Sequence, residues 1–310
     1  MKKISLIIIT ILILALTGCS ELRLAPPLDK SVLFLVDSVE CSTNEAVFRL
    51  LEEKKYYQAD SDEIFWFRAV GDITFEEYIK DSIKEELLRC AASVILADDM
   101  NLFLTEEQEA SALAKAADAY NDIKNTYNTD AYGITLEDVE NLYIKKAIYN
   151  MVYDKLSADV EMEISEADTK VIKVNYVLLP GTLSLNEVEA IRTDIKSGTS
   201  LATAVQAYEV TPVMSRVLKK GEMPEEFEKA AYALLDGELS EIIESKDGKY
   251  LIQCVEDYMV TESVANRNLI YSSARKEKFD KAYREFAEKS LLRFNSDVWD
   301  RIKVSELGTE

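Results

Sequence analysis

The sequence predicts an α+β protein in which a mostly helical part, built from both ends of the chain, carries an inserted small α/β domain. Three observations predict this class. Ser or Thr followed three positions later by an acid or amide recurs through the first half, as at helix N-termini. Between residues 171 and 255 the chain changes to β-rich runs separated by short helices. After Asp257 a charged amphipathic helix returns, with its apolar residues spaced to lie on one face.

The first residues have the pattern of a bacterial secretion signal. Lys2 and Lys3 precede an apolar run over 4–16, which is too short to span ~30 Å of hydrocarbon. The run ends in Leu16-Thr17-Gly18-Cys19, which resembles the lipobox of bacterial lipoproteins. The resemblance implies a signal peptide over 1–18, lipid on Cys19, and an extracytoplasmic position anchored to the bacterial cell membrane. The alternative is an ordinary or uncleaved signal in which the cysteine is accidental.

Composition excludes several classes of function. The net charge of −21 repels nucleic acid, so we expect no nucleic-acid partner. The chain has no histidine, which removes the usual base of a Ser or Cys triad and the commonest zinc ligand. Cys41, Cys90 and Cys254 lack CxxC spacing, so neither a disulfide framework nor a metal site is indicated, and their redox state stays open. We expect no metal and no cofactor.

The first half is predicted to be helical. A tether over 19–30 leads into a helical domain over 31–165, which opens with a short strand over 32–36. Helices are expected over 75–100, 106–127 and 136–160. The predicted helix starts pair a hydroxyl with an acid or amide three residues on: Ser42/Glu45, Thr74/Glu77, Thr105/Gln108 and Thr135/Asp138.

The inserted domain is predicted over 166–257. A strand over 171–179 ends at Pro180-Gly181, and helices follow over 185–197, about 200–208 and 225–235. A closing strand is expected over 249–255. The remaining residues, 258–310, are expected to form a helix that packs back on the helical domain.

The segment from Lys220 to Ser240 resembles the parvulin-type rotamase signature. It contains a Gly-x-Met turn, a Phe-Glu-x-Ala-Ala helix and a Gly-Glu-x-Ser before the last strand. The resemblance covers about residues 170–257. With the lipobox and the flanking helices, the whole chain resembles the extracytoplasmic foldases of the PrsA and SurA families. That resemblance implies a peptidyl-prolyl isomerase domain beside a helical chaperone domain, with unfolded or partly folded secreted polypeptides as partners. Whether the chain forms a homodimer stays open.

Apolar residues at the implied site match positions that grip the proline ring. Met223 and Phe227 match these positions, and Leu218 is expected to line the same wall. The alternative is that Met223 and Phe227 attach their helix to the core of their own domain.

The polar half of the implied site departs from the family pattern. Two histidines and a Cys or Asp of the family fall on Tyr176, Tyr250 and Thr211, which are the candidate catalytic residues here. Their hydroxyls can still donate and accept hydrogen bonds. The alternative is that the tyrosines are packing residues of the sheet.

The helical half offers one candidate surface for capturing clients, Phe65-Trp66-Phe67. The alternative is that this triplet is buried. The leading hypothesis is therefore a lipid-anchored foldase, and the second is a non-catalytic chaperone or interaction module that uses the parvulin fold as a binding surface. A solute-binding lipoprotein would share the extracytoplasmic, membrane-anchored location, but the long helical first half argues against the two doubly wound lobes that such a protein needs.

Overall fold

The computed structural model describes residues 27–58, 63–160, 164–208, 210, 212–246 and 248–308. The predicted signal peptide, Cys19 and Thr211 lie outside these described residues. The chain divides into two compact units: unit 1 comprises Met1–Tyr149 with Phe286–Glu310, and unit 2 comprises Asn150–Glu285. In the described ranges, no helix combines the length and the apolar character needed to cross a bilayer.

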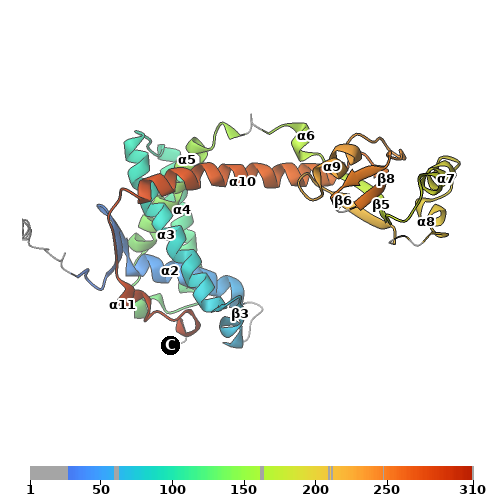
Figure 1. Cartoon of the computed structure of the whole chain (residues 1–310). Helices are drawn as coiled ribbons and strands as arrows, with labels where there is room; N and C mark the ends of the chain where they lie inside the picture. The colour runs from blue at the N-terminus through green and yellow to red at the C-terminus, as the bar shows by residue number, and fades with distance from the viewer. Residues whose placement is uncertain are drawn as a thin grey trace, which may run out of the picture. The chain divides into compact units, whose positions relative to one another are not determined.

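Unit 1 is mostly helical and is built from both chain ends (Figure 1). Its elements are β1 (Val32–Val36), β2 (Val39–Ser42), α2 (Thr43–Gln58), the 3₁₀ helix η1 (Glu63–Phe67), β3 (Ala69–Val70), β4 (Ile73–Thr74), α3 (Phe75–Asp99), α4 (Glu106–Lys124), the 3₁₀ helix η2 (Thr129–Tyr132), the first part of α5 (Leu136–Leu156), β9 (Leu292–Phe294), α11 (Ser296–Trp299) and the 3₁₀ helix η4 (Val304–Glu306).

The predicted helix starts are confirmed by their hydrogen bonds. Thr74 and Thr105 each form a capping box, in which the Thr side chain accepts the backbone N–H three residues on and that residue's side chain accepts the Thr N–H. Ser42 Oγ likewise accepts the N–H of Glu45 at 3.0 Å. Each contact satisfies an otherwise unpaired donor in the first turn of the helix.

The end of the chain completes the fold of unit 1. Strand β9 pairs antiparallel with β1, so that Phe34 lies opposite Phe294, in a sheet of order β2-β1-β9. The last residues then pack on α3, where Lys80 Nζ donates to the carbonyls of Trp299 and Ile302 at 2.8 and 2.7 Å. Glu76 Oε1 accepts the N–H of Val304 at 2.7 Å. The side chains of α3 therefore fix the path of a segment more than 200 residues later in the sequence.

Unit 2 contains a small α/β domain. Its elements are the end of α5, α6 (Glu166–Thr169), β5 (Ile172–Leu179), α7 (Leu185–Lys196), α8 (Leu201–Ala204), β6 (Met214–Leu218), α9 (Glu225–Ala231), β7 (Ile243–Ser245), β8 (Gly248–Glu256) and most of α10 (Val260–Ala287). The strands form an antiparallel four-stranded sheet of order β6-β5-β8-β7. The β-rich runs at 171–179 and 249–255 are its two central strands, and together the two units confirm the predicted α+β class.

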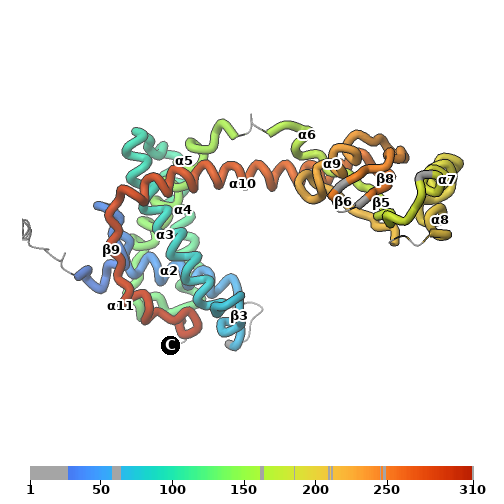
Figure 2. Tube along the Cα trace, viewed as in Figure 1, coloured from blue at the N-terminus to red at the C-terminus, as the bar shows by residue number. Residues whose placement is uncertain are grey.

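The sheet of unit 2 has a separate core on each face. In Figure 2, α9 lies on one side of β5 and β8, and α7 and α8 lie on the other. Because side chains alternate along a strand, neighbouring residues of β5 enter different cores. Val177 and Leu179 pack with buried residues of α7 and α8, whereas Val174 and Tyr176 pack with buried residues of α9. The face toward α9 carries the residues predicted to form the site.

Helix α10 is attached to the rest of unit 2 at both ends of its span within that unit. Ser263 Oγ accepts the N–H of Val171 at 2.9 Å, and Asn266 Nδ2 donates to the carbonyl of Thr169 at 3.1 Å. Farther along, Arg275 pairs with Asp154 near the end of α5. Buried side-chain hydrogen bonds of this kind position β5 relative to the helix that follows the domain.

Candidate functional site

Three aromatic rings form the centre of the candidate site. Tyr176 of β5 lies opposite Ile252, and Tyr250 of β8 lies opposite Leu178, so the two tyrosines are diagonal neighbours on one face of the sheet. Phe227 projects from α9 onto the same face. Its ring centroid lies 5.2 Å from that of each tyrosine, at interplanar angles of 82° and 89°. These edge-to-face contacts are the favoured geometry for aromatic pairs.

The rings are buried to different degrees. Phe227 has no exposed surface, whereas Tyr176 and Tyr250 are 6% and 7% exposed. Leu218 of β6, opposite Ile172, is also fully buried. Any client that reaches this cluster must therefore touch the edges of the tyrosines and the less buried residues around them.

Met223 is one of the half-buried residues that pack against the cluster. It lies in the turn between β6 and α9, and Glu228 Oε1 accepts the N–H groups of Glu222 and Met223 at 2.8 and 2.9 Å. These charge-assisted hydrogen bonds hold the turn against the first turns of α9. The backbone of Met223 is thereby fixed, and its side chain packs against the cluster.

The edge strand β6 adds two residues that sequence reasoning missed. Met214 lies opposite Tyr176 and is 54% exposed, and Arg216 lies opposite Val174. Arg216 Nη1 contacts Met223 Sδ at 3.5 Å. The signal that could have identified them is their spacing from Leu218, since residues 214, 216 and 218 of one strand share a face.

Tyr232 closes the opposite side of the cluster. Its hydroxyl lies 3.1 Å from the carbonyl oxygen of Leu218 and 3.3 Å from that of Lys170, to both of which it can donate. Burial, followed by the charges of Glu228 and Glu222, raises the pKa of Tyr232 above its usual range. The hydroxyl therefore stays protonated as a structural donor at neutral pH.

Of the six predicted site residues of this domain, the structure brings five together. Tyr176, Tyr250, Phe227, Leu218 and Met223 belong to one cluster, which we call the ring cluster. Thr211 lies outside the described residues. The catalytic and substrate-binding roles of all six stay predictions.

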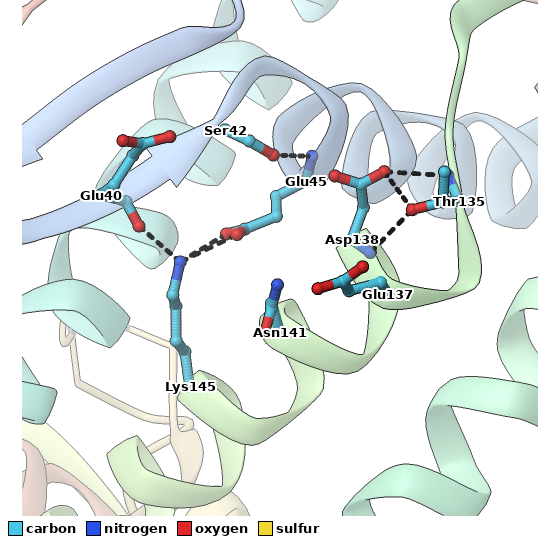
Figure 3. Close-up of a pocket in the computed structure, with 8 residues that line it drawn as sticks. All are labelled: Glu40, Ser42, Glu45, Thr135, Glu137, Asp138, Asn141 and Lys145. Carbon is cyan, nitrogen blue, oxygen red and sulfur yellow. Dashed lines mark hydrogen bonds and ion pairs between the residues drawn. The ribbon is translucent and has the colours of Figure 1, made fainter.

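Unit 1 has a polar pocket with a volume of about 320 Å³ (Figure 3). Lys145 of α5 reaches into it and donates to Glu45 at 2.8 and 2.9 Å, and its ammonium also contacts the carbonyl of Glu40. Burial raises the pKa of Glu45, while Lys145 opposes that shift. Asp138, also in the lining, caps α5 through Thr135. These contacts join β2 and α2 to α5. Among the described residues, no group of His, Cys, Asp or Glu side chains is arranged to hold a metal ion.

Unit 1 also exposes an apolar surface around η1. Here the structure divides the predicted triplet: Trp66 is 3% exposed and belongs to the core, whereas Phe67 is 63% exposed. Ile64 of the same 3₁₀ helix is 71% exposed, and Tyr56, whose ring meets that of Tyr57 where Tyr57 packs on Phe65 and Trp66, is 76% exposed. We call Tyr56, Ile64 and Phe67 the η1 surface.

Comparisons with known proteins identify the domain of unit 2. Residues 184–256 match the rotamase family model described as a PPIC-type PPIase domain. This match confirms the predicted resemblance to parvulin-type rotamases. Among curated proteins the chain has no significant match.

Solved structures of foldases match over longer stretches. PrsA of Bacillus cereus, described as a peptidylprolyl isomerase, is 19% identical with a TM-score of 0.34, and the match covers 79% of this chain and 95% of that one. PrsA of Bacillus anthracis is 18% identical with a TM-score of 0.27, over 66% and 96%. A SurA-like chaperone of Campylobacter jejuni is 11% identical with a TM-score of 0.27, over 86% and 99%.

Proposed function

We propose that this chain is an extracytoplasmic folding factor that binds proline-containing segments of unfolded secreted polypeptides and accelerates their cis–trans isomerisation. The observation that carries the proposal is the PPIC-type match over 184–256, because it covers β6, α9 and β8, which carry Leu218, Phe227 and Tyr250 of the ring cluster; Tyr176 of β5 precedes the matched residues. Met223 and the edges of Tyr176 and Tyr250 are the parts of that cluster that a client proline contacts.

The chemistry asked of the site is modest. Isomerisation forms no covalent bond to the protein, and its barrier of ~18–20 kcal/mol falls when the twisted amide is favoured over the planar one. A surface that removes water from the imide and places hydroxyl groups beside it favours the twisted amide. Met223 and Met214 provide apolar contact, and the hydroxyls of Tyr176 and Tyr250 provide hydrogen bonds.

The polar groups of this site are weaker acids and bases than histidine. Hydroxyl groups act at such a site by donating and accepting hydrogen bonds. We therefore expect slow catalysis.

Removal of the hydroxyls tests this assignment. The chain over 20–310 is assayed for cis-to-trans isomerisation of short X-Pro peptides, beside Tyr176→Phe and Tyr250→Phe, which keep the rings. We expect acceleration by the parent chain and a lower kcat/KM in both variants. Full activity in both variants would remove the tyrosines from the mechanism.

A second function is favoured by the η1 surface. Three large apolar side chains that are more than half exposed, in a chain of net charge −21, are suited to hold unfolded, apolar segments. We propose that unit 1 binds clients in this way whether or not unit 2 isomerises them.

The membrane anchor and the homodimer belong to the same proposal. Their support is the sequence 16–19 and the family resemblance. The mass of the protein extracted from membranes should exceed that of residues 19–310 by the lipid on Cys19. Light scattering of the chain over 20–310 should give twice the mass of one chain.

A further inference from the structure

We infer that Arg216 makes unit 2 prefer prolyl segments that carry a carboxylate next to the proline. The inference rests on the proposed function in one respect, namely that client prolines contact Met223. It adds a determinant of specificity that the ring cluster alone does not provide.

The strand register places Arg216 on the face of the ring cluster. Its partner across the ladder is Val174, and the flanking pairs are Met214 with Tyr176 and Leu218 with Ile172. Val174 and Ile172 are buried toward α9 in the same cluster as Tyr176. Because paired residues project to the same face of a sheet, Arg216 lies on that face too. Strand β6 is the edge of the sheet, so this position is open to an arriving peptide.

The guanidinium is held beside Met223. Arg216 Nη1 contacts Met223 Sδ at 3.5 Å, and Arg216 Nη2 lies 3.6 Å from Glu222 Oε2. A proline ring resting on the Met223 thioether would place its neighbouring residue next to this cation. The most direct contact available to that residue is a carboxylate bound by the guanidinium.

The existing partners of Arg216 leave room for such a carboxylate. Glu222 lies beyond ordinary hydrogen-bond distance, and its Oε2 also accepts the N–H of Lys219 at 3.3 Å. Glu228 Oε1, on α9, already accepts two N–H groups of the turn between β6 and α9. The Arg216 side chain is 40% exposed, and a guanidinium has five N–H donors. It can therefore bind a second carboxylate without releasing Met223.

The test measures binding, so that it does not depend on catalysis. The chain over 20–310, labelled at its methionine methyl groups, is titrated with Ala-Glu-Pro-Phe, Ala-Gln-Pro-Phe, Ala-Ala-Pro-Glu and Ala-Ala-Pro-Gln, and shifts of the Met223 and Met214 signals give Kd. Arg216→Gln is compared with Arg267→Gln, which removes an exposed charge of α10 and changes the net charge equally. Ala-Glu-Ala-Phe controls for the proline.

We expect at least one glutamate peptide to bind about three- to fivefold more tightly than its glutamine counterpart, the range of an exposed ion pair. The preference should disappear in Arg216→Gln, persist in Arg267→Gln and weaken in 0.5 M NaCl. Equal affinity for Glu and Gln peptides, or a preference that survives Arg216→Gln, would overturn the inference. A charge preference without any acceleration of isomerisation would overturn the proposed catalysis alone. Failure to bind any of the prolyl peptides would overturn both.

Discussion

The ring of Phe227 meets the ring of Tyr176 edge to face, with centroids 5.2 Å apart. This contact joins α9 to β5 in the small α/β domain of unit 2, and Phe227, which lies within the residues that match the PPIC-type model, has no exposed surface. The same ring is therefore part of the core of the domain and part of the floor of its candidate site.

Truncation of Phe227 should lower the stability of unit 2. We expect Phe227→Ala to lower the free energy of unfolding of unit 2 by about 3–5 kcal/mol, because it removes a fully buried ring and leaves a cavity. Both tryptophans, Trp66 and Trp299, lie in unit 1. Circular dichroism or amide NMR must therefore follow the unfolding of unit 2. A loss below 1 kcal/mol would show that the ring is not packed as described.

Changes to the η1 surface should weaken the binding of client polypeptides and leave the stability of unit 1 nearly unchanged. Phe67→Ser should leave the unfolding of unit 1 nearly unchanged, since the ring is 63% exposed, and should weaken suppression of client aggregation by several-fold. Phe103→Ser is the matched control, because Phe103 is 72% exposed in the loop between α3 and α4 of the same unit. Equal loss in both variants would show a nonspecific effect of surface apolarity, and no loss in either would argue against this capture surface.

Acid should weaken unit 1 through Glu86, which links three helices. Arg49 Nε of α2 donates to its carboxylate at 3.1 Å, and Lys146 of α5 lies 3.2 Å from it. Burial raises the pKa of Glu86, but the Arg49 hydrogen bond and the Lys146 charge outweigh burial, so the net shift is downward from about 4.5. A lowered folded-state pKa contributes stability that is present above about pH 4.5 and is lost as pH falls through the folded value.

Glu86→Gln should therefore cost about 1–2 kcal/mol at pH 7 and progressively less below pH 4.5. Tryptophan fluorescence during urea unfolding at several pH values measures this difference. Glu85→Gln is the control, since Glu85 is 47% exposed and pairs with Arg89 of its own helix. If Glu86→Gln lowered the free energy of unfolding by the same amount at pH 3 as at pH 7, the expected link between the pKa of Glu86 and stability would be wrong.

Much of the fold could be predicted from local chemistry. The capping residues Thr74 and Thr105 mark helix starts because a side-chain oxygen and a free N–H are neighbours in the sequence. The β-rich runs at 171–179 and 249–255 predicted the two central strands. Strands β6 and β7 were missed because edge strands are short and partly exposed, so their sequences carry little apolar alternation.

The site was harder to predict than the fold. Tyr176, Phe227 and Met223 followed from the resemblance, but which of them a client can reach depends on burial, which no local pattern gives. The Phe65-Trp66-Phe67 triplet shows the same limit, since the 3₁₀ turn buries Trp66 and exposes Phe67. Arg216 was missed because strand β6 itself was not predicted, so its spacing from Leu218 could not place it on the face of the predicted site.

The central claim is that client prolines contact Met223 in unit 2. The direct test compares the cis-to-trans rate of X-Pro peptides with the chain over 20–310, with Met223→Ala and with Met100→Ala, a half-buried methionine of unit 1. We predict acceleration by the parent chain and Met100→Ala, and a loss of about tenfold in Met223→Ala with its fold intact, about the ratio that removal of one apolar contact produces. Acceleration that is unchanged in Met223→Ala, or absent from the parent chain on every peptide, would contradict the claim.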